Sequence, residues 1–126
     1  MESEKNFENR IKSFLKNEGS WFIKYWSGGV PTKEGVKKFT KDGVPDILCC
    51  FEGLFMGIEV KAPKGKPSKL QLYNLRKIDE AGGFGILLYP KDFRKFKKFC
   101  HLLKEDYIVE ADNLYRELKG VWSDDE

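Results

Sequence analysis

The sequence predicts a mixed α/β domain in which a four-stranded mixed sheet is flanked by helices. Three observations predict this class. Apolar residues recur at helical spacing in three segments, short apolar runs bounded by turn residues alternate with them, and the 126 residues suit one domain rather than two. The expected order is helix, three strands, helix, strand, helix.

The first expected element is a helix over residues 3–17, with Ser3 as N-cap and Gly19 as its end. Its apolar side chains fall along one face: Phe7, Ile11, Phe14 and Leu15. Residues 21–26, which are aromatic and β-branched, predict a short strand.

Residues 27–43 are rich in glycine and lysine and predict a long basic loop of functional importance. Two apolar runs follow, at 46–51 and 54–61, and only Glu52-Gly53 separates them. This pattern predicts a β-hairpin.

The second half begins with a connection at 62–67, rich in proline, glycine and lysine. A helix is expected to start at Ser68 and to end at Gly82-Gly83, and residues 84–89 predict a buried strand. Asp92 can cap a further helix. The residues expected to point inward from that helix are Phe93, Phe96, Cys100 and Leu103.

Charge is unevenly distributed along the chain, whose net charge is +3. Residues 105–126 hold eight acidic and two basic side chains, so the remainder is strongly basic. The positive charge of residues 1–104 suits a polyanionic partner such as nucleic acid. Lysines that merely solvate the surface would give the same net charge. Residues 1–105 are expected to form the domain, and 106–126 an acidic C-terminal extension, either within the domain or as a loose tail.

The three cysteines, Cys49, Cys50 and Cys100, make a poor disulfide framework because their number is odd and two are adjacent. They predict buried thiols in a reducing cytosol. No apolar run approaches the about 20 residues that span a bilayer, and the charged N-terminus lacks an apolar signal core. The expected location is therefore cytoplasmic, with no membrane partner.

The candidate chemistry lies in Asp46, Glu59 and Lys61. Alternation along a strand places Glu59 and Lys61 on one side while Ile58 and Val60 face the core. Asp46 begins the neighbouring strand, so two carboxylates and an ammonium group are expected at one sheet edge. Carboxylates suit Mg²⁺, and a lysine beside them can orient a nucleophile. An exposed cross-strand ion pair, worth about 0–1 kcal/mol, is the alternative.

These residues resemble a known motif. Val44-Pro45-Asp46 followed by Ile58-Glu59-Val60-Lys61 looks like the pattern of PD-(D/E)XK nucleases. The wider context, residues 43–71, resembles the small stand-alone VRR-NUC branch of phages and bacteria, and also archaeal-type Holliday junction resolvases. The resemblance covers about residues 4–90. It implies a restriction-endonuclease-like αβββαβ core and a protein of a bacterial or phage-infected cell.

The resemblance implies a metal-dependent endonuclease that hydrolyses DNA phosphodiester bonds, with a preference for branched or Holliday-junction-like DNA. It implies that Lys61 positions the attacking water. The implied ligands of Mg²⁺ or Mn²⁺ are Glu8, Asp46, Glu59 and the Val60 carbonyl. Glu4, one turn earlier on the same helix face, is the alternative to Glu8.

Gln71 is a supporting catalytic candidate by the same likeness, although Ser68 and Gln71 also fit a capping box. The residues expected to contact DNA are Ser27, Lys33, Lys37, Lys38, Lys41, Lys64, Lys66 and Lys69. The likeness further implies a homodimer, and phage replication, recombination and repair are all compatible with it.

Three other functions stay open at this point. A nicking, flap or restriction-type nuclease would keep the fold and change the substrate. A nucleic-acid-binding module would keep the basic surface without catalysis. A structural or partner-binding subunit would use the acidic extension for docking.

Overall fold

A computed structural model describes residues 1–26, 30–37 and 41–123. Its main sheet has the strand order β1-β4-β5-β6, in which β1, β4 and β5 are antiparallel neighbours and β6 lies parallel to β5. The strands are β1 (Trp21–Lys24), β4 (Ile47–Phe51), β5 (Leu54–Val60) and β6 (Phe84–Leu88). The predicted fold class, a mixed four-stranded sheet flanked by helices, is confirmed.

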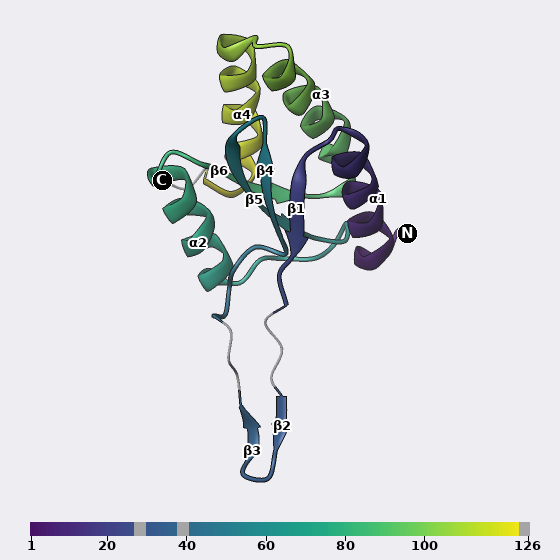
Figure 1. Ribbon diagram of the computed structural model, residues 1–126, viewed down its shortest axis with the longest axis vertical. Helices are drawn as coiled ribbons and strands as arrows, with labels where there is room; N and C mark the ends of the chain where they lie inside the picture. Colours follow the sequence, from purple (N-terminus) through teal and green to yellow (C-terminus); the bar gives the residue numbers. More distant parts are fainter. Residues whose placement is uncertain (27–29, 38–40, 124–126) are drawn as a thin grey trace.

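Helix α1 (Glu4–Asn17) covers one face of the sheet (Figure 1). The Ser3 side chain caps it by accepting a hydrogen bond from the Asn6 amide. Phe7, Ile11 and Leu15 are fully buried, as their spacing predicts. Strand β1 follows after a tight turn, and it ends two residues earlier than predicted.

The predicted hairpin at Glu52-Gly53 is confirmed. Phe51 pairs with Leu54, and the two turn residues have φ values of 50° and 79°. Two positive φ angles in succession match the twist of the flanking strands. This turn fixes the β4–β5 register, on which the position of the candidate site depends.

The prediction of a long basic loop at 27–43 is wrong for its middle part, which forms a hairpin. Strands β2 (Val30–Thr32) and β3 (Gly35–Lys37) pair with each other as a second, two-stranded sheet. This hairpin projects away from the main sheet (Figure 1). Each strand has only three residues, too few to show the alternation of apolar and polar side chains that predicts a strand.

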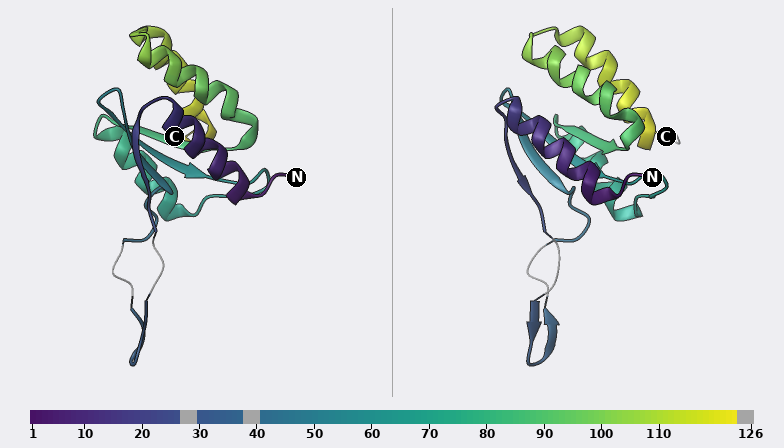
Figure 2. Two further views of the ribbon diagram at one scale, coloured as in Figure 1. Left: turned by 45° about the vertical axis from the view of Figure 1, so that its right-hand side comes forward. Right: turned by 90° about the vertical axis from the view of Figure 1, so that its right-hand side faces the viewer.

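Helix α2 (Lys69–Glu80) covers the opposite face of the sheet (Figure 2). Leu75 of α2 packs against Leu87 of β6 in a second, smaller apolar cluster. The helix approaches β6 so closely that a Cβ at Gly85 would lie 2.5 Å from the Leu75 carbonyl oxygen. Glycine is therefore required there.

A 3-10 turn, η1 (Pro90–Asp92), leads into helix α3 (Phe93–Lys104). The residues predicted to point inward from α3 are all buried: Phe93, Phe96, Cys100 and Leu103. Asp92 occupies the N-cap position, but its side chain makes no capping hydrogen bond, so the predicted cap is wrong.

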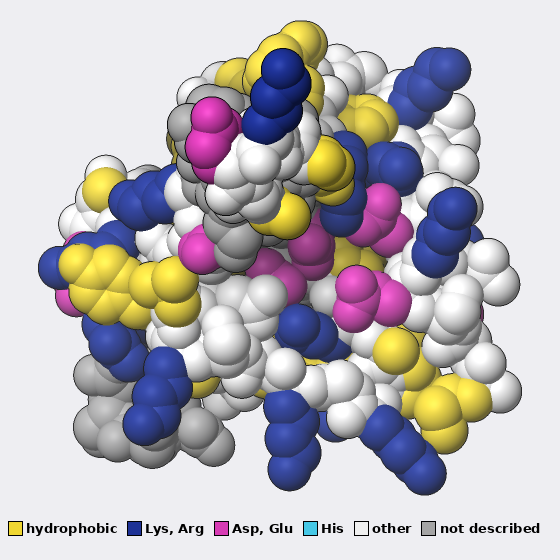
Figure 3. Space-filling view, turned by 90° about the horizontal axis from the view of Figure 1, so that it is seen from below, with side chains coloured by type: hydrophobic (Ala, Val, Ile, Leu, Met, Phe, Trp, Pro, Cys, Tyr) yellow, Lys and Arg dark blue, Asp and Glu magenta, His cyan; other side chains and the backbone are white. Residues whose placement is uncertain are grey.

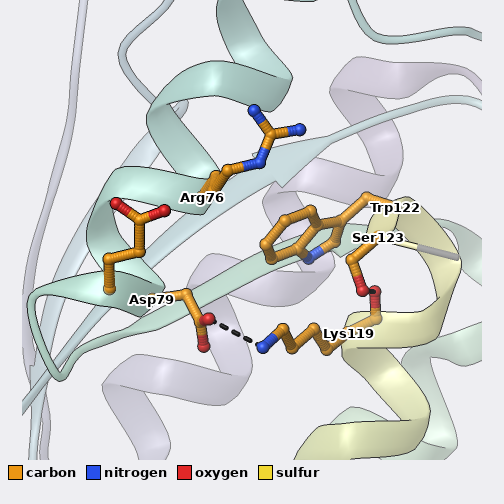
Figure 4. A pocket seen from close by; sticks show the side chains of 6 residues that line it. Arg76, Asp79, Lys119, Trp122 and Ser123 are labelled. Atoms are coloured by element: carbon orange, nitrogen blue, oxygen red, sulfur yellow. Dashed lines mark hydrogen bonds and ion pairs between the residues drawn. The ribbon is translucent and has the colours of Figure 1, made fainter. Parts of the chain in front are cut away.

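Helix α4 (Ile108–Ser123) belongs to the domain, so the loose-tail alternative fails for these residues. Four of its side chains are buried: Ala111, Tyr115, Leu118 and Trp122. Tyr115 Oη accepts a hydrogen bond from the Gly85 amide, and Trp122 Nε1 donates one to the Gly85 carbonyl. Lys119 Nζ lies 2.7 Å from Asp79 Oδ2 and ties α4 to α2 (Figure 4). Helix α4 thus covers the β6 edge of the sheet.

Of the three thiols, Cys49 and Cys100 are buried as predicted, but Cys50 is exposed, because alternation in β4 turns it away from the main core. Across the described ranges, no helix has the length and apolar character needed to cross a membrane.

Candidate functional site

Asp46 lies between β1 and β5 at one end of the sheet. The register pairs Ile47 with Ile58, which brings the preceding Asp46 beside Glu59. Asp46 Oδ2 accepts a hydrogen bond of 2.8 Å from the Val60 amide, and its carbonyl accepts one of 2.7 Å from the Tyr25 amide. Both neighbouring strands therefore hold Asp46 in place.

Glu59 is a buried carboxyl with unusual electrostatics. It is 2% exposed, and its Oε1 atom is buried without a hydrogen-bond partner among the described residues. Burial and, after it, the adjacent Asp46 carboxylate raise the pKa of Glu59 to about 8. Lys61, with Nζ 3.5 Å from Glu59 Oε2, offsets this rise only in part. Two carboxyl groups in contact need a proton or a cation between them.

Glu8 of α1 reaches the same end of the sheet and is 8% exposed. Its Oε1 lies 2.6 Å from Lys24 Nζ, and its Oε2 lies 3.4 Å from Lys12 Nζ. Glu4, the alternative ligand, is exposed in the first turn of α1. Of the two acids, Glu8 is the one that joins the cluster.

Lys24 at the end of β1 connects Glu8 to the two strand carboxyls. Its Nζ lies 2.6 Å from Glu8 and 3.5 Å from Asp46 Oδ1. Partial burial lowers the pKa of Lys24, but the hydrogen bonds and charges of Glu8 and Asp46 more than offset this, and the pKa is raised. The sequence analysis did not select Lys24. The feature that could have identified Lys24 is its position in the strand that pairs with β4, directly opposite Ile47.

Four of the five predicted catalytic residues therefore lie in one connected cluster together with Lys24, in the order Glu8, Lys24, Asp46, Glu59 and Lys61. We call it the acidic cluster. The fifth predicted residue, Gln71, caps helix α2. Within residues 1–26, 30–37 and 41–123, no three His, Cys, Asp or Glu side chains are arranged so that they could hold one metal ion. The Lys24 ammonium group separates Glu8 from Asp46 and Glu59, and this separation was not predicted.

Seen from the end of the molecule that carries the β2–β3 hairpin, acidic side chains gather in the middle of the face and Lys and Arg side chains lie around them (Figure 3). In such an arrangement the surrounding cations attract a polyanion, and the acids at the centre attract a positive counterion.

Gln71 has a defined structural role. Its Oε1 accepts a hydrogen bond of 2.8 Å from the Ser68 amide, while Ser68 Oγ accepts one of 3.1 Å from the Gln71 amide. The predicted capping box at the start of α2 is thus confirmed. The catalytic role suggested for Gln71 stays a prediction.

The predicted DNA-contacting residues fall into three groups. Lys64, Lys66 and Lys69 are exposed on or beside the turn after β5, and Lys33 is exposed in the β2–β3 turn. Lys41 is exposed, and its backbone amide donates a hydrogen bond to Tyr25 Oη, just after β1. Ser27 and Lys38 lie outside the described residues, and for Lys37 only the backbone is described.

The fold and the site together define a mixed α/β protein with a partly buried acidic cluster at the end of its sheet. Comparison of the chain with protein-family models, with curated proteins and with solved structures finds no match.

Proposed function

We propose that this protein is a metal-dependent endonuclease that hydrolyses DNA phosphodiester bonds. The observation that carries the proposal is the contact between Asp46 and Glu59 beside Lys61, close to the exposed lysines of the turn after β5. A buried acid pair is costly to maintain unless a cation or proton joins it. Exposed lysines close to the pair suit the phosphates of nucleic acid.

The implied metal fits Asp46 and Glu59, whereas Glu8 is paired with Lys24 and does not join them. The buried Glu59 Oε1 has no hydrogen-bond partner in the described part of the chain, as expected of an atom that ligates a cation. Asp46, Glu59 and the Val60 carbonyl would hold Mg²⁺ or Mn²⁺, whose preferred ligands are oxygens. Glu8 would complete the set only if the Lys24 ammonium group left its position between Glu8 and Asp46. Bound there, the ion would polarise a phosphoryl oxygen and lower the pKa of a water molecule.

Lys61 would assist the attack on the phosphorus atom. Its ammonium group is mostly buried and lies next to Glu59. There it would orient the attacking water and offset the negative charge that develops on the phosphoryl oxygens. An ammonium group has greater effect in a partly buried site than in bulk water.

The proposed substrate is branched or otherwise structured DNA, and the proposed active form is a homodimer. The projecting β2–β3 hairpin supports an extended contact, since an isolated two-stranded hairpin is marginally stable without a partner. A nicking, flap or restriction-type specificity would use the same cluster.

The test is cleavage of four-way junctions, flaps and plain duplex, each with Mg²⁺, Mn²⁺ or EDTA. We expect cleavage with either metal, none with EDTA, and a loss of about 100-fold or more for Glu59→Gln. Glu80→Gln changes an exposed acid paired with Lys77 and is the matched control. Metal-independent cleavage, or equal rates for both variants, would contradict the proposal.

A second candidate, a DNA-binding module without catalysis, is favoured by one observation. Lys24 already neutralises Glu8 and Asp46, so the cluster can persist as an internal ion-pair network. If wild type and Glu59→Gln bind DNA equally and neither cuts any substrate with either metal, the binding module is the correct function.

A further inference from the structure

A pocket of about 450 Å³ lies beside the acidic cluster, where the turn after β5 meets the end of β6. Its lining includes Lys64, Gly65 and Lys66 from the turn, Tyr89 and Lys91 from the segment after β6, and Val121 from α4. Strands β5 and β6 are parallel, so their carboxyl ends meet at one edge of the sheet. The pocket therefore opens at the same edge as Glu59 and Lys61.

The wall of this pocket is held by hydrogen bonds. Tyr89 Oη donates a hydrogen bond of 2.8 Å to the Gly65 carbonyl, and the Gly65 amide donates one of 2.9 Å to the Ala62 carbonyl. The first bond joins two segments that are 24 residues apart in the chain. The turn thus has a fixed position relative to β6.

Three ammonium groups border the pocket without a matching acid. In the described part of the chain, no carboxylate forms an ion pair with Lys64, Lys66 or Lys91. Asp92 follows Lys91 in the chain but does not line the pocket. Burial raises the pKa of Tyr89, and the charge of Asp92 adds to this effect. Three lysines around one hollow leave positive charge that an anion would neutralise.

The pocket and the acidic cluster are in direct contact through Lys61. A Cβ at Gly65 would lie 3.3 Å from Cδ of Lys61, so the turn packs against the stem of that lysine. The Lys61 amide in turn donates a hydrogen bond of 3.0 Å to the Leu88 carbonyl, one residue before Tyr89. An anion bound in the pocket would therefore lie next to a ligand that contacts Lys61.

The geometry points to a phosphate-binding subsite: this pocket takes a backbone phosphate of the nucleic-acid strand that crosses the acidic cluster. The inference rests on the proposed function, because a strand that reaches Glu59 and Lys61 must leave the cluster on one side. On the β1 side, Lys12 and Lys24 are already paired with acids. On the β6 side, the described part of the chain places no carboxylate against the lysines of the pocket, and Lys91 Nζ lies 6.0 Å from the centre of the Tyr89 ring. That side therefore offers the strand positive charge that no acid among the described residues neutralises.

The test measures binding of a fluorescently labelled single-stranded oligonucleotide in EDTA, by anisotropy, over a range of salt concentrations. Lys91→Gln is compared with Lys98→Gln, which removes one exposed charge from α3 away from the pocket. We expect Lys91→Gln to weaken binding several-fold and to reduce the slope of log K against log[salt] by about 0.7, the value for one phosphate contact on a single strand. Lys98→Gln should match the wild type.

A second measurement separates a strand phosphate from free phosphate. Inorganic phosphate is titrated alone and in competition with the oligonucleotide, and the amides of Gly65 and Lys91 are followed by NMR. We expect the oligonucleotide to shift these amides and to displace inorganic phosphate. Tight binding of inorganic phosphate that the oligonucleotide cannot displace would overturn the inference, as would equal affinities and salt slopes for the two variants.

These outcomes are independent of the cleavage test. Binding at the pocket without any cleavage would contradict the nuclease proposal and leave the subsite supported. Metal-dependent cleavage together with an unchanged salt slope for Lys91→Gln would support the nuclease proposal and contradict the subsite.

Discussion

Glu59 links the stability of the metal-free protein to pH. Burial and Asp46 raise its pKa from 4.5 to about 8. A carboxyl whose pKa is raised on folding binds its proton more tightly in the folded state. Its contribution to stability is therefore fully present below the unfolded pKa and is lost as the pH rises through the folded pKa.

We expect the free energy of unfolding of wild type in EDTA to fall between about pH 5 and about pH 8, by on the order of a few kcal/mol, since a tenfold change in proton affinity is about 1.4 kcal/mol. Glu59→Gln, which is neutral throughout, should lose this dependence. Urea denaturation at several pH values measures it, with Glu80→Gln as the control that keeps the wild-type slope. A wild-type stability that rises over this range would refute the assignment.

If the acidic cluster binds a metal ion as proposed, the Lys24 ammonium group would compete with that ion for Glu8 and Asp46. This ammonium group contacts both Glu8 and Asp46, whereas Lys12 contacts Glu8 alone. We expect Lys24→Gln to lower the stability of the metal-free protein by about 1 kcal/mol, a value that allows for the partial exposure of the pair. The same change should tighten Mn²⁺ binding, because it removes a competing cation.

Calorimetric titration with Mn²⁺ measures this second effect, and Lys12→Gln is the control. If Lys24→Gln leaves Mn²⁺ affinity unchanged or weaker, the ammonium group does not compete with the ion.

At the scale of elements, the first turn of α2 fixes the position of Gln71. Because Gln71 and Ser68 complete a capping box, we expect Gln71→Ala to cost about 1 kcal/mol of stability. Glutamate serves equally well at this position of the motif, so Gln71→Glu should retain wild-type stability. Thermal unfolding measures both variants. Cleavage by Gln71→Glu distinguishes the roles: normal rates indicate a cap alone, and a large loss indicates contact with the substrate.

Most elements could be predicted because their signals are local. The stripe Phe7, Ile11 and Leu15 predicted α1, and Glu52-Gly53 between two apolar runs predicted the hairpin and its register. From that register, the proximity of Asp46 and Glu59 followed directly. These features depend only on neighbours in the sequence and on the alternation of side chains along a strand.

The remaining features could not be predicted because they depend on contacts between distant segments. Lys24 has the appearance of an ordinary exposed strand lysine until α1 brings Glu8 to it. Nothing local indicates that Tyr115 and Trp122 bond to both backbone groups of Gly85. The short β2–β3 hairpin lacks the alternation that identifies longer strands.

At the scale of the whole molecule, the two edges of the main sheet differ. At β6, Tyr115 and Trp122 of α4 satisfy the outward backbone groups of Gly85. At β1, the residues that the structure describes provide no further strand. Next to that open edge, Trp21, Cys50 and Phe55 lie in register across three strands, and Trp21 is 65% exposed. An open edge beside an exposed apolar row is a site of association.

We expect a second copy of the chain to occupy this face, since antiparallel pairing of two β1 edges about a two-fold axis would bury both apolar rows and continue the sheet. Trp21→Lys should convert the dimer to a monomer, because it places two like charges close to the axis, while the fold is retained since Trp21 contributes little to the core. Val109→Lys changes an equally exposed apolar residue at the start of α4 and should leave the dimer intact. Sedimentation velocity at several concentrations measures the outcome. A wild-type protein that sediments as a monomer throughout, or a Trp21→Lys variant that remains dimeric, would show that this face is not the dimer interface.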